Sequence, residues 1–170
     1  MNTNFIFAKG ITNKQIDQLV EYSKTDPEVI KFTSDPKRFK DSETAKKWLK
    51  NVSVYTLTDG KNLMGIAWFH ILPIPERKFT IKLNPNDFSL TYAIRIYGEA
   101  RGKGLGVKFM KDAFDDYKPK NLWGQISSEN IPSIKLAEKF GFKKVSEPDQ
   151  RGKIIMVLHK RHPELVSGSI

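Results

Sequence analysis

The apolar positions in the first half of the chain change from helical to strand spacing. Residues 13–24 carry apolar side chains every three or four positions, and Thr12 before them can cap a helix. The Asp26–Pro27 pair ends that pattern, and a second helical pattern through Leu49 begins after Asp41 or Ser42. Asp59–Gly60 is typical of a hairpin turn. We therefore expect helices over 13–24 and from 42 onward, and strands over 4–8, 54–58 and 63–72.

In the second half, apolar runs alternate with amphipathic stretches. Three prolines between residues 73 and 87 predict a loop, with a short strand at 79–83 inside it. The remaining pattern predicts strands over 90–96, 122–126 and 154–159 and helices over 104–117 and 132–140. This order indicates a single mixed α/β (α+β) domain over residues 1–161. A small polar segment, 162–170, is expected to be a flexible tail.

Length and composition narrow the classes of function. The chain has 170 residues, and none of its apolar runs approaches the roughly 20 residues that cross a bilayer. The first ten residues lack the basic segment and apolar core of a secretory signal, so we expect a cytoplasmic protein that does not enter membranes. The absence of cysteine excludes disulfides, thiolate metal sites and a cysteine nucleophile. His70, His159 and His162 are not spaced as metal ligands, so no metal site is expected.

The chain is basic, with 29 Lys and Arg against 19 Asp and Glu, a formal net charge of +10. Such a balance favours polyanionic partners, but a solvated basic surface explains most of these lysines equally well. The sequence contains no recognised nucleic-acid motif and no stripe of basic residues interleaved with aromatics. Binding to nucleic acid is therefore not favoured, whereas a polyanionic small molecule agrees with part of the charge.

A glycine-rich loop, Arg101 to Gly106, separates the predicted strand 90–96 from the predicted helix 104–117. Glycine frees backbone N–H groups at a helix N-terminus, where phosphate binds well. The string lacks the Gly-x-x-x-x-Gly-Lys-Ser/Thr pattern of a Walker A loop. It also departs from Gly-x-Gly-x-x-Gly, because the glycines stand at 102, 104 and 106. The pattern Gln/Arg-x-x-Gly-x-Gly/Ala fits it without gaps.

That loop resembles the pyrophosphate-binding motif of the GNAT superfamily of acyl-CoA-dependent N-acetyltransferases. A second segment, Asn130 to Phe142, is similar to another signature of that family, Asn-x-x-Ala/Ser-x-x-Leu-Tyr-x-x-x-Gly-Phe. It begins 24 residues after Gly106, with one predicted strand between. The resemblance is firm over Leu90 to Val145. It implies a central mixed, mostly antiparallel sheet flanked by helices, with a splayed strand pair that forms the CoA cleft.

The resemblance also implies where acetyl-CoA, as co-substrate, is held. Backbone amides of the loop and the dipole of the following helix bind the pyrophosphate, with cationic help from two side chains of the loop. The strand at 94–96 binds the pantetheine arm, and the backbone N–H of Ile94 polarises the thioester carbonyl as an oxyanion hole does. Asn130 hydrogen-bonds the pantetheine. The cofactor-binding positions are thus Ile94, Arg95, Ile96, Arg101, Gly102, Lys103, Gly104, Leu105, Gly106, Val107, Asn130 and Ser133.

The sequence departs from the family at the two positions that usually move protons. Acetyl transfer to an amine requires loss of a proton from the attacking ammonium and gain of one by the leaving thiolate. Ala137 stands where the family often has a tyrosine acid, and Gln125 stands where one branch has a glutamate base. The side-chain acid and base are therefore unknown. Other groups from nearby segments, or water, can serve, and the candidates are Tyr97, Glu99 and Glu129, with Tyr92 and His70 as further neighbours.

The leading interpretation is an acyltransferase that moves an acetyl group from acetyl-CoA to a primary amine by direct attack. The alternative is a catalytically weak acyl-CoA-binding sensor or regulatory module, because both usual proton handlers are missing. The acceptor is a small molecule or a protein, and it is set in the family by segments that correspond to 29–39 and 73–87 here. Three basic residues in the second segment disfavour a polycationic acceptor. Both a monomer and a homodimer agree with the sequence.

Overall fold

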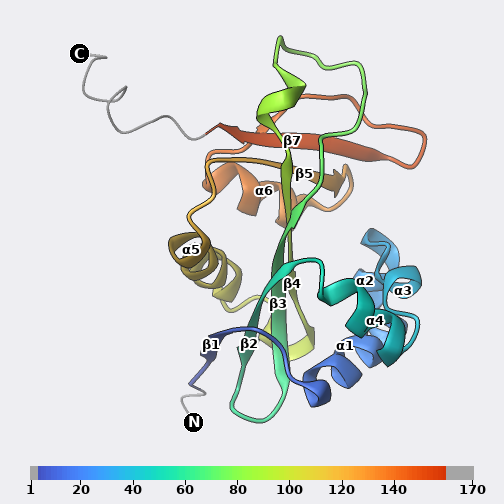
Figure 1. The fold of residues 1–170 in the computed structure, drawn as a ribbon, viewed down its shortest axis with the longest axis vertical. Helices are drawn as coiled ribbons and strands as arrows, with labels where there is room; N and C mark the ends of the chain where they lie inside the picture. The colour runs from blue at the N-terminus through green and yellow to red at the C-terminus, as the bar shows by residue number, and fades with distance from the viewer. Residues whose placement is uncertain (1–3, 160–170) are drawn as a thin grey trace. The chain divides into compact units, whose positions relative to one another are not determined.

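The computed structural model describes residues 4–159 (Figure 1). The strands are β1 (Ile6–Lys9), β2 (Ser53–Thr58), β3 (Leu63–Ile71), β4 (Leu90–Ile96), β5 (Asn121–Ser127), β6 (Lys143–Lys144) and β7 (Lys153–His159). The helices are α1 (Asn13–Thr25), α2 (Pro27–Phe32), α3 (Asp35–Arg38), α4 (Ser42–Leu49), α5 (Leu105–Tyr117) and α6 (Ile131–Lys139). No helix in this described part of the chain is long and apolar enough to cross a membrane.

The strands form one mixed sheet in the order β1-β2-β3-β4-β5-β7-β6. The pairs β1–β2, β2–β3, β5–β7 and β6–β7 are antiparallel, and β4 runs parallel to β5. That parallel pair is described at Thr91 opposite Trp123, where the Thr91 hydroxyl donates to the Trp123 carbonyl oxygen at 2.8 Å. The predicted fold class is therefore confirmed. The splay of the two strands beyond this pair, and the CoA cleft that it would open, stay predictions.

The chain divides into two compact units, and each is described by itself. The first comprises residues 4–71 and 92–118, and the second comprises 72–91 and 119–159. The predicted single domain over 1–161 stays a prediction, and the predicted tail at 162–170 lies outside the described residues.

In the first unit, the strands separate two helical layers (Figure 1). One layer, α1 to α4, packs its apolar side chains against β2 and β3, and α1 begins with a capping box between Thr12 and Gln15. The other layer is α5, where Phe109, Phe114 and Tyr117 meet aromatic rings from β1 and β3. Alternation along β2 and β3 thus buries both faces of these two strands.

In the second unit, the long antiparallel pair β5–β7 carries the core. Its inward side chains include Trp123 and Ile155, which pack with Ile74 and Phe88 of the preceding loop. The loop is fastened by polar contacts as well, because Trp123 Nε1 donates to the Leu72 carbonyl oxygen at 2.8 Å. The guanidinium of Arg77 donates to the carbonyl oxygens of Glu147 and Lys153, at 2.6 and 3.1 Å. The proline-rich segment before β4 is thereby held in place, with one short 3-10 helix at Pro85–Asp87.

Most predicted elements are present, with ends displaced by one or two residues. The predicted strand at 79–83 is wrong, because Phe79 and Leu83 bury their side chains against the core of the second unit without a strand ladder. The sequence pattern also missed α2 and α3, along with the two-residue β6. The Asp26–Pro27 pair does end α1, but the Asp26 carboxylate also caps α2, and Pro27 occupies its first position.

Gly65 allows β3 and β4 to approach closely. A Cβ atom at this position would lie 2.9 Å from the backbone oxygen of Arg95 and 3.3 Å from a ring carbon of Phe109. The first contact is with backbone, which cannot rotate away. The close packing of β3 against β4 therefore depends on the absence of a side chain at Gly65.

We expect Gly65→Ala to lower the free energy of unfolding by about 1–3 kcal/mol, because the added methyl group forces β3 and β4 apart. Chemical denaturation monitored by tryptophan fluorescence measures this loss. Lys61→Ala, in the exposed hairpin before the same strand, serves as the control and leaves the midpoint unchanged. An unchanged midpoint for Gly65→Ala would show that the strands separate without cost.

Candidate functional site

The glycine loop, residues 101–106, lies between β4 and α5 and contains two residues in the left-handed backbone region. Gly102 has φ 74° and Gly104 has φ 71°, and a Cβ atom at either position would meet nothing within 4 Å. Because the surrounding space is open, the requirement for glycine comes from backbone conformation. Gly104 is also the residue before the first turn of α5, where the helix has no side-chain cap.

The amides that follow these glycines are available to a ligand. Within residues 4–159, no backbone N–H from Gly102 to Val107 donates to a side chain or to a loop carbonyl oxygen. The first turn of α5 contains no acidic residue, so the positive end of the helix dipole is not neutralised there. Lys103 is exposed on the same loop. Unpaired amides, a helix N-terminus and a lysine together make a suitable site for a phosphate group.

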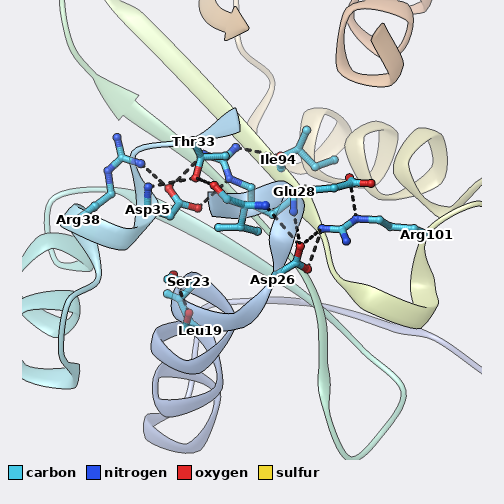
Figure 2. A network of polar contacts seen from close by, with 11 residues as sticks. Leu19, Ser23, Asp26, Glu28, Thr33, Asp35, Arg38, Ile94 and Arg101 are labelled. Carbon is cyan, nitrogen blue, oxygen red and sulfur yellow. Dashed lines mark hydrogen bonds and ion pairs between the residues drawn. The ribbon is translucent and has the colours of Figure 1, made fainter. Parts of the chain in front are cut away.

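Arg101, at the start of this loop, has its guanidinium on carboxylates of the early helices (Figure 2). Its Nη2 lies 2.8 Å from both Asp26 oxygens, and its Nε lies 3.1 Å from a Glu28 oxygen. The Asp26 side chain is only 7% exposed and also accepts from the backbone amides of Glu28 and Val29. The predicted contact of Arg101 with pyrophosphate stays a prediction, since the structure gives this side chain two protein partners.

Asp35, at the start of α3, holds Arg95 of β4 in a similar way, and Figure 2 labels Asp35 beside its other partner, Arg38. The Asp35 carboxylate is fully buried and accepts from Arg95 Nε at 2.8 Å and Nη2 at 3.2 Å, and from Arg38 Nη1 at 2.6 Å. Burial alone would lower the pKa of Arg95, but the Asp35 carboxylate raises it above its usual value. The Arg95 guanidinium also donates to the Ile94 carbonyl oxygen at 3.1 Å. The strand that carries Ile94 is thus tied to the first residue of α3, Asp35.

Aromatic rings cover the ion pairs that Asp35 makes with Arg38 and Arg95. The guanidinium of Arg38 lies 4.9 Å from the ring centroid of Trp48 and 5.5 Å from that of Trp68. Trp68 also stacks with Arg95 at 5.1 Å, so one indole contacts both cations. Rings in these positions exclude water and strengthen the pairing between the arginines and Asp35.

The three candidate acid or base side chains occupy different environments. Tyr97 is 3% exposed and packs on Tyr22, with ring centroids 4.6 Å apart. Burial, and then the negative charge of Asp35, raise the pKa of Tyr97 well above its usual value, so its hydroxyl stays protonated at neutral pH. Glu99 and Glu129 are both exposed to solvent. Glu99 belongs to the first unit and Glu129 to the second. Neither carboxylate makes an ion pair within residues 4–159.

The second signature segment lies in the second unit. Asn130 caps α6 and accepts a hydrogen bond from the Ser133 backbone amide at 3.4 Å. Ala137, at the position of the family's tyrosine, is completely buried, and Gln125 on β5 is exposed. The structure therefore groups 94–96 and 101–107 in one unit, and Asn130 and Ser133 in the other.

Sequence reasoning missed Asp26 and Asp35, which organise the polar network. Each is followed by proline, and Asp-Pro is a signal for a helix start. That signal was available, but it gives no information about the arginines, which are 60 and more positions away in the chain.

The chain is similar to known proteins in both sequence and fold. The family model "Acetyltransferase (GNAT) domain" matches residues 9–143. Among solved structures, yncA from Salmonella typhimurium with acetyl-CoA has a TM-score of 0.70 at 17% identity, covering 94% of this chain and 96% of that one. An N-acetyltransferase from Staphylococcus aureus Mu50 has a TM-score of 0.68 at 17% identity, and the match covers 92% of this chain and 98% of that one. Ribosomal-protein-alanine N-acetyltransferase from Brucella melitensis has a TM-score of 0.69 at 17% identity, and the match covers 91% of this chain and 99% of that one.

No curated protein matches the chain. The structural neighbours share the fold, and the family model covers well over half of the sequence. The chain therefore belongs to the GNAT acetyltransferase family, a family of acyltransferases.

Proposed function

We propose that this protein transfers the acetyl group of acetyl-CoA to the primary amine of a small-molecule or protein acceptor. One observation supports it above the others: the unpaired amides of residues 102–107 at the start of α5, in a chain of the GNAT family. A neighbour in fold, yncA, was solved with acetyl-CoA as its cofactor. The basic net charge of +10 agrees with an anionic co-substrate.

The residues of the loop fit the pyrophosphate of coenzyme A. Gly102 and Gly104 have left-handed backbone, the amides of residues 102–107 donate to no side chain or loop carbonyl oxygen of the described chain, and the dipole of α5 favours negative charge at that point. Lys103 is exposed on the same loop and supplies a cation. In the second unit, Asn130 and Ser133 are proposed to contact the pantetheine arm. Within residues 4–159 there is no cluster of side chains that could hold a metal ion.

The backbone of β4 is proposed to hold the reacting carbonyl. Bound acetyl-CoA supplies an activated thioester, and the N–H of Ile94 is the group proposed to polarise its carbonyl oxygen. A backbone donor acts well only if its strand cannot shift. The ion pair between Arg95 and the buried Asp35 restrains that strand at the neighbouring residue.

No protein side chain is assigned to the proton transfers. Ala137 carries no titratable group, Gln125 is neutral, and the Tyr97 hydroxyl is buried and protonated. The simplest proposal is that the acceptor enters as the neutral amine and that water receives and returns protons. A thiolate is a good leaving group, so protonation of the sulfur is not required before the C–S bond breaks.

We expect Gly104→Ala to raise the dissociation constant for acetyl-CoA about fivefold to thirtyfold, since a left-handed conformation costs a non-glycine residue about 1–2 kcal/mol. Isothermal titration calorimetry measures this change. Gly10→Ala is a matched control, because Gly10 has φ 95° and open space around it but lies outside the loop. Both variants lose stability, and only Gly104→Ala loses affinity. Equal affinity for acetyl-CoA in the wild type, Gly104→Ala and Gly10→Ala would contradict the proposed binding site in the loop.

We expect the rate of acetyl transfer to rise with pH until the acceptor amine is deprotonated, because only the neutral amine attacks and no carboxylate removes its proton. Release of CoA thiol, followed with two acceptors whose pKa values differ by about two units, gives profiles displaced by a similar amount. A common midpoint would instead identify an enzyme group as the base.

Two variants locate such a base if it exists. Glu99→Gln and Glu129→Gln leave the pH midpoint in place under the proposal, and a displaced midpoint in either variant assigns the proton to that glutamate. Acetyl-CoA binding without thiol release for any amine would favour the alternative function, an acyl-CoA sensor. The buried Ala137 is the observation behind that alternative.

A further inference from the structure

We propose that Asp26 is a positioning residue for the cofactor loop and acts through Arg101. The inference rests on the proposed function for its effect on acetyl-CoA, but the effect on the loop itself is independent of any ligand. It assigns to the α1–α2 junction a role in cofactor binding that the loop motif alone does not suggest.

The contact between Asp26 and Arg101 is short, involves both carboxylate oxygens and is largely shielded from solvent. Arg101 Nη2 donates to both carboxylate oxygens at 2.8 Å, with the Asp26 side chain 7% exposed and that of Arg101 28% exposed. The second partner, Glu28, is 59% exposed, so water weakens its pairing at 3.1 Å. Asp26 is therefore the partner that decides where the guanidinium lies.

The loop has few other restraints. Within residues 4–159, Arg101 is the only residue from 98 to 104 whose side chain makes a hydrogen bond or an ion pair. Its backbone amide donates to the Gly98 carbonyl oxygen at 3.1 Å, and the next three residues include both left-handed glycines. Glycine is the most flexible residue, so a loop of this kind needs an external anchor to keep its amides aligned.

Asp26 itself is rigid, which makes it a suitable anchor. Its backbone N–H donates to the Tyr22 carbonyl oxygen and ends α1, while its side chain caps α2 at the Glu28 and Val29 amides. Pro27 fixes the backbone immediately after it. Asp26 thus joins α1 to α2, and both of its carboxylate oxygens also accept hydrogen bonds from Arg101 of the loop.

Asp26→Asn separates the two functions of this side chain. Asparagine is as good an N-cap as aspartate, so α2 keeps its cap, but the negative charge that holds Arg101 is removed. Asp41→Asn is the matched control, because Asp41 caps α4 through the Thr44 amide at 2.7 Å and makes no ion pair within residues 4–159. Glu28→Gln tests the exposed partner, and Arg101→Gln removes the cation itself.

The first measurement is the order parameter of the Gly102 and Gly104 amides from ¹⁵N relaxation. We expect about 0.85 in the wild type and in Asp41→Asn, and about 0.6 or less in Asp26→Asn and Arg101→Gln. Glu28→Gln stays near the wild type. Equal order parameters in the wild type and Asp26→Asn would overturn the proposal.

The second measurement is the dissociation constant for acetyl-CoA by calorimetry. We expect it to rise about tenfold in Asp26→Asn and to stay within about twofold in Asp41→Asn and Glu28→Gln. The double variant Asp26→Asn with Arg101→Gln binds no more weakly than Arg101→Gln alone, because the effect of Asp26 passes through Arg101. Additive losses would show that Asp26 acts by another route and would overturn the proposal.

The two measurements separate this inference from the proposed function. If the wild type does not bind acetyl-CoA, the proposed function fails, and the order parameters still decide whether Asp26 holds the loop. If the wild type binds and Asp26→Asn loosens the loop without loss of affinity, the positioning role in binding is wrong while the function stands.

Discussion

The first unit depends on two aspartates that neutralise arginines 60 and 75 positions later in the sequence. Asp35 is buried with Arg95 of β4, and Asp26 is nearly buried with Arg101 of the loop. Removal of either partner from such a pair leaves a charge with little solvent, which is far more costly than the loss of a surface salt bridge. The early helices, β4 and the glycine loop are therefore placed together by the same kind of interaction.

Most elements, and the glycine loop between β4 and α5, were predictable from local sequence. Thr12 and Asp41 cap helices as expected, β4 has the predicted ends, and the left-handed glycines fall where the motif places them. These features depend on the residue itself and on its near neighbours. A motif that requires particular backbone angles can be recognised without knowledge of the fold.

The polar network was not predictable, because its partners are distant in sequence and each has an ordinary local explanation. Asp26 ends a helix, Asp35 precedes a proline, and Arg101 belongs to a phosphate motif. Nothing in these contexts indicates that the carboxylates and the arginines pair. The failed strand at 79–83 has a similar cause, since Phe79 and Leu83 obtain burial from tertiary packing rather than from a ladder.

Ala137 has a consequence for how this protein could change during evolution. Its methyl group is completely buried on α6, and its carbonyl oxygen accepts a hydrogen bond from the Phe142 amide at 3.0 Å. A tyrosine at this position would have to displace packed side chains before its hydroxyl could reach any substrate. A single substitution therefore does not place a tyrosine hydroxyl at this position. A lineage with this core gains such a hydroxyl only after neighbouring buried side chains have become smaller.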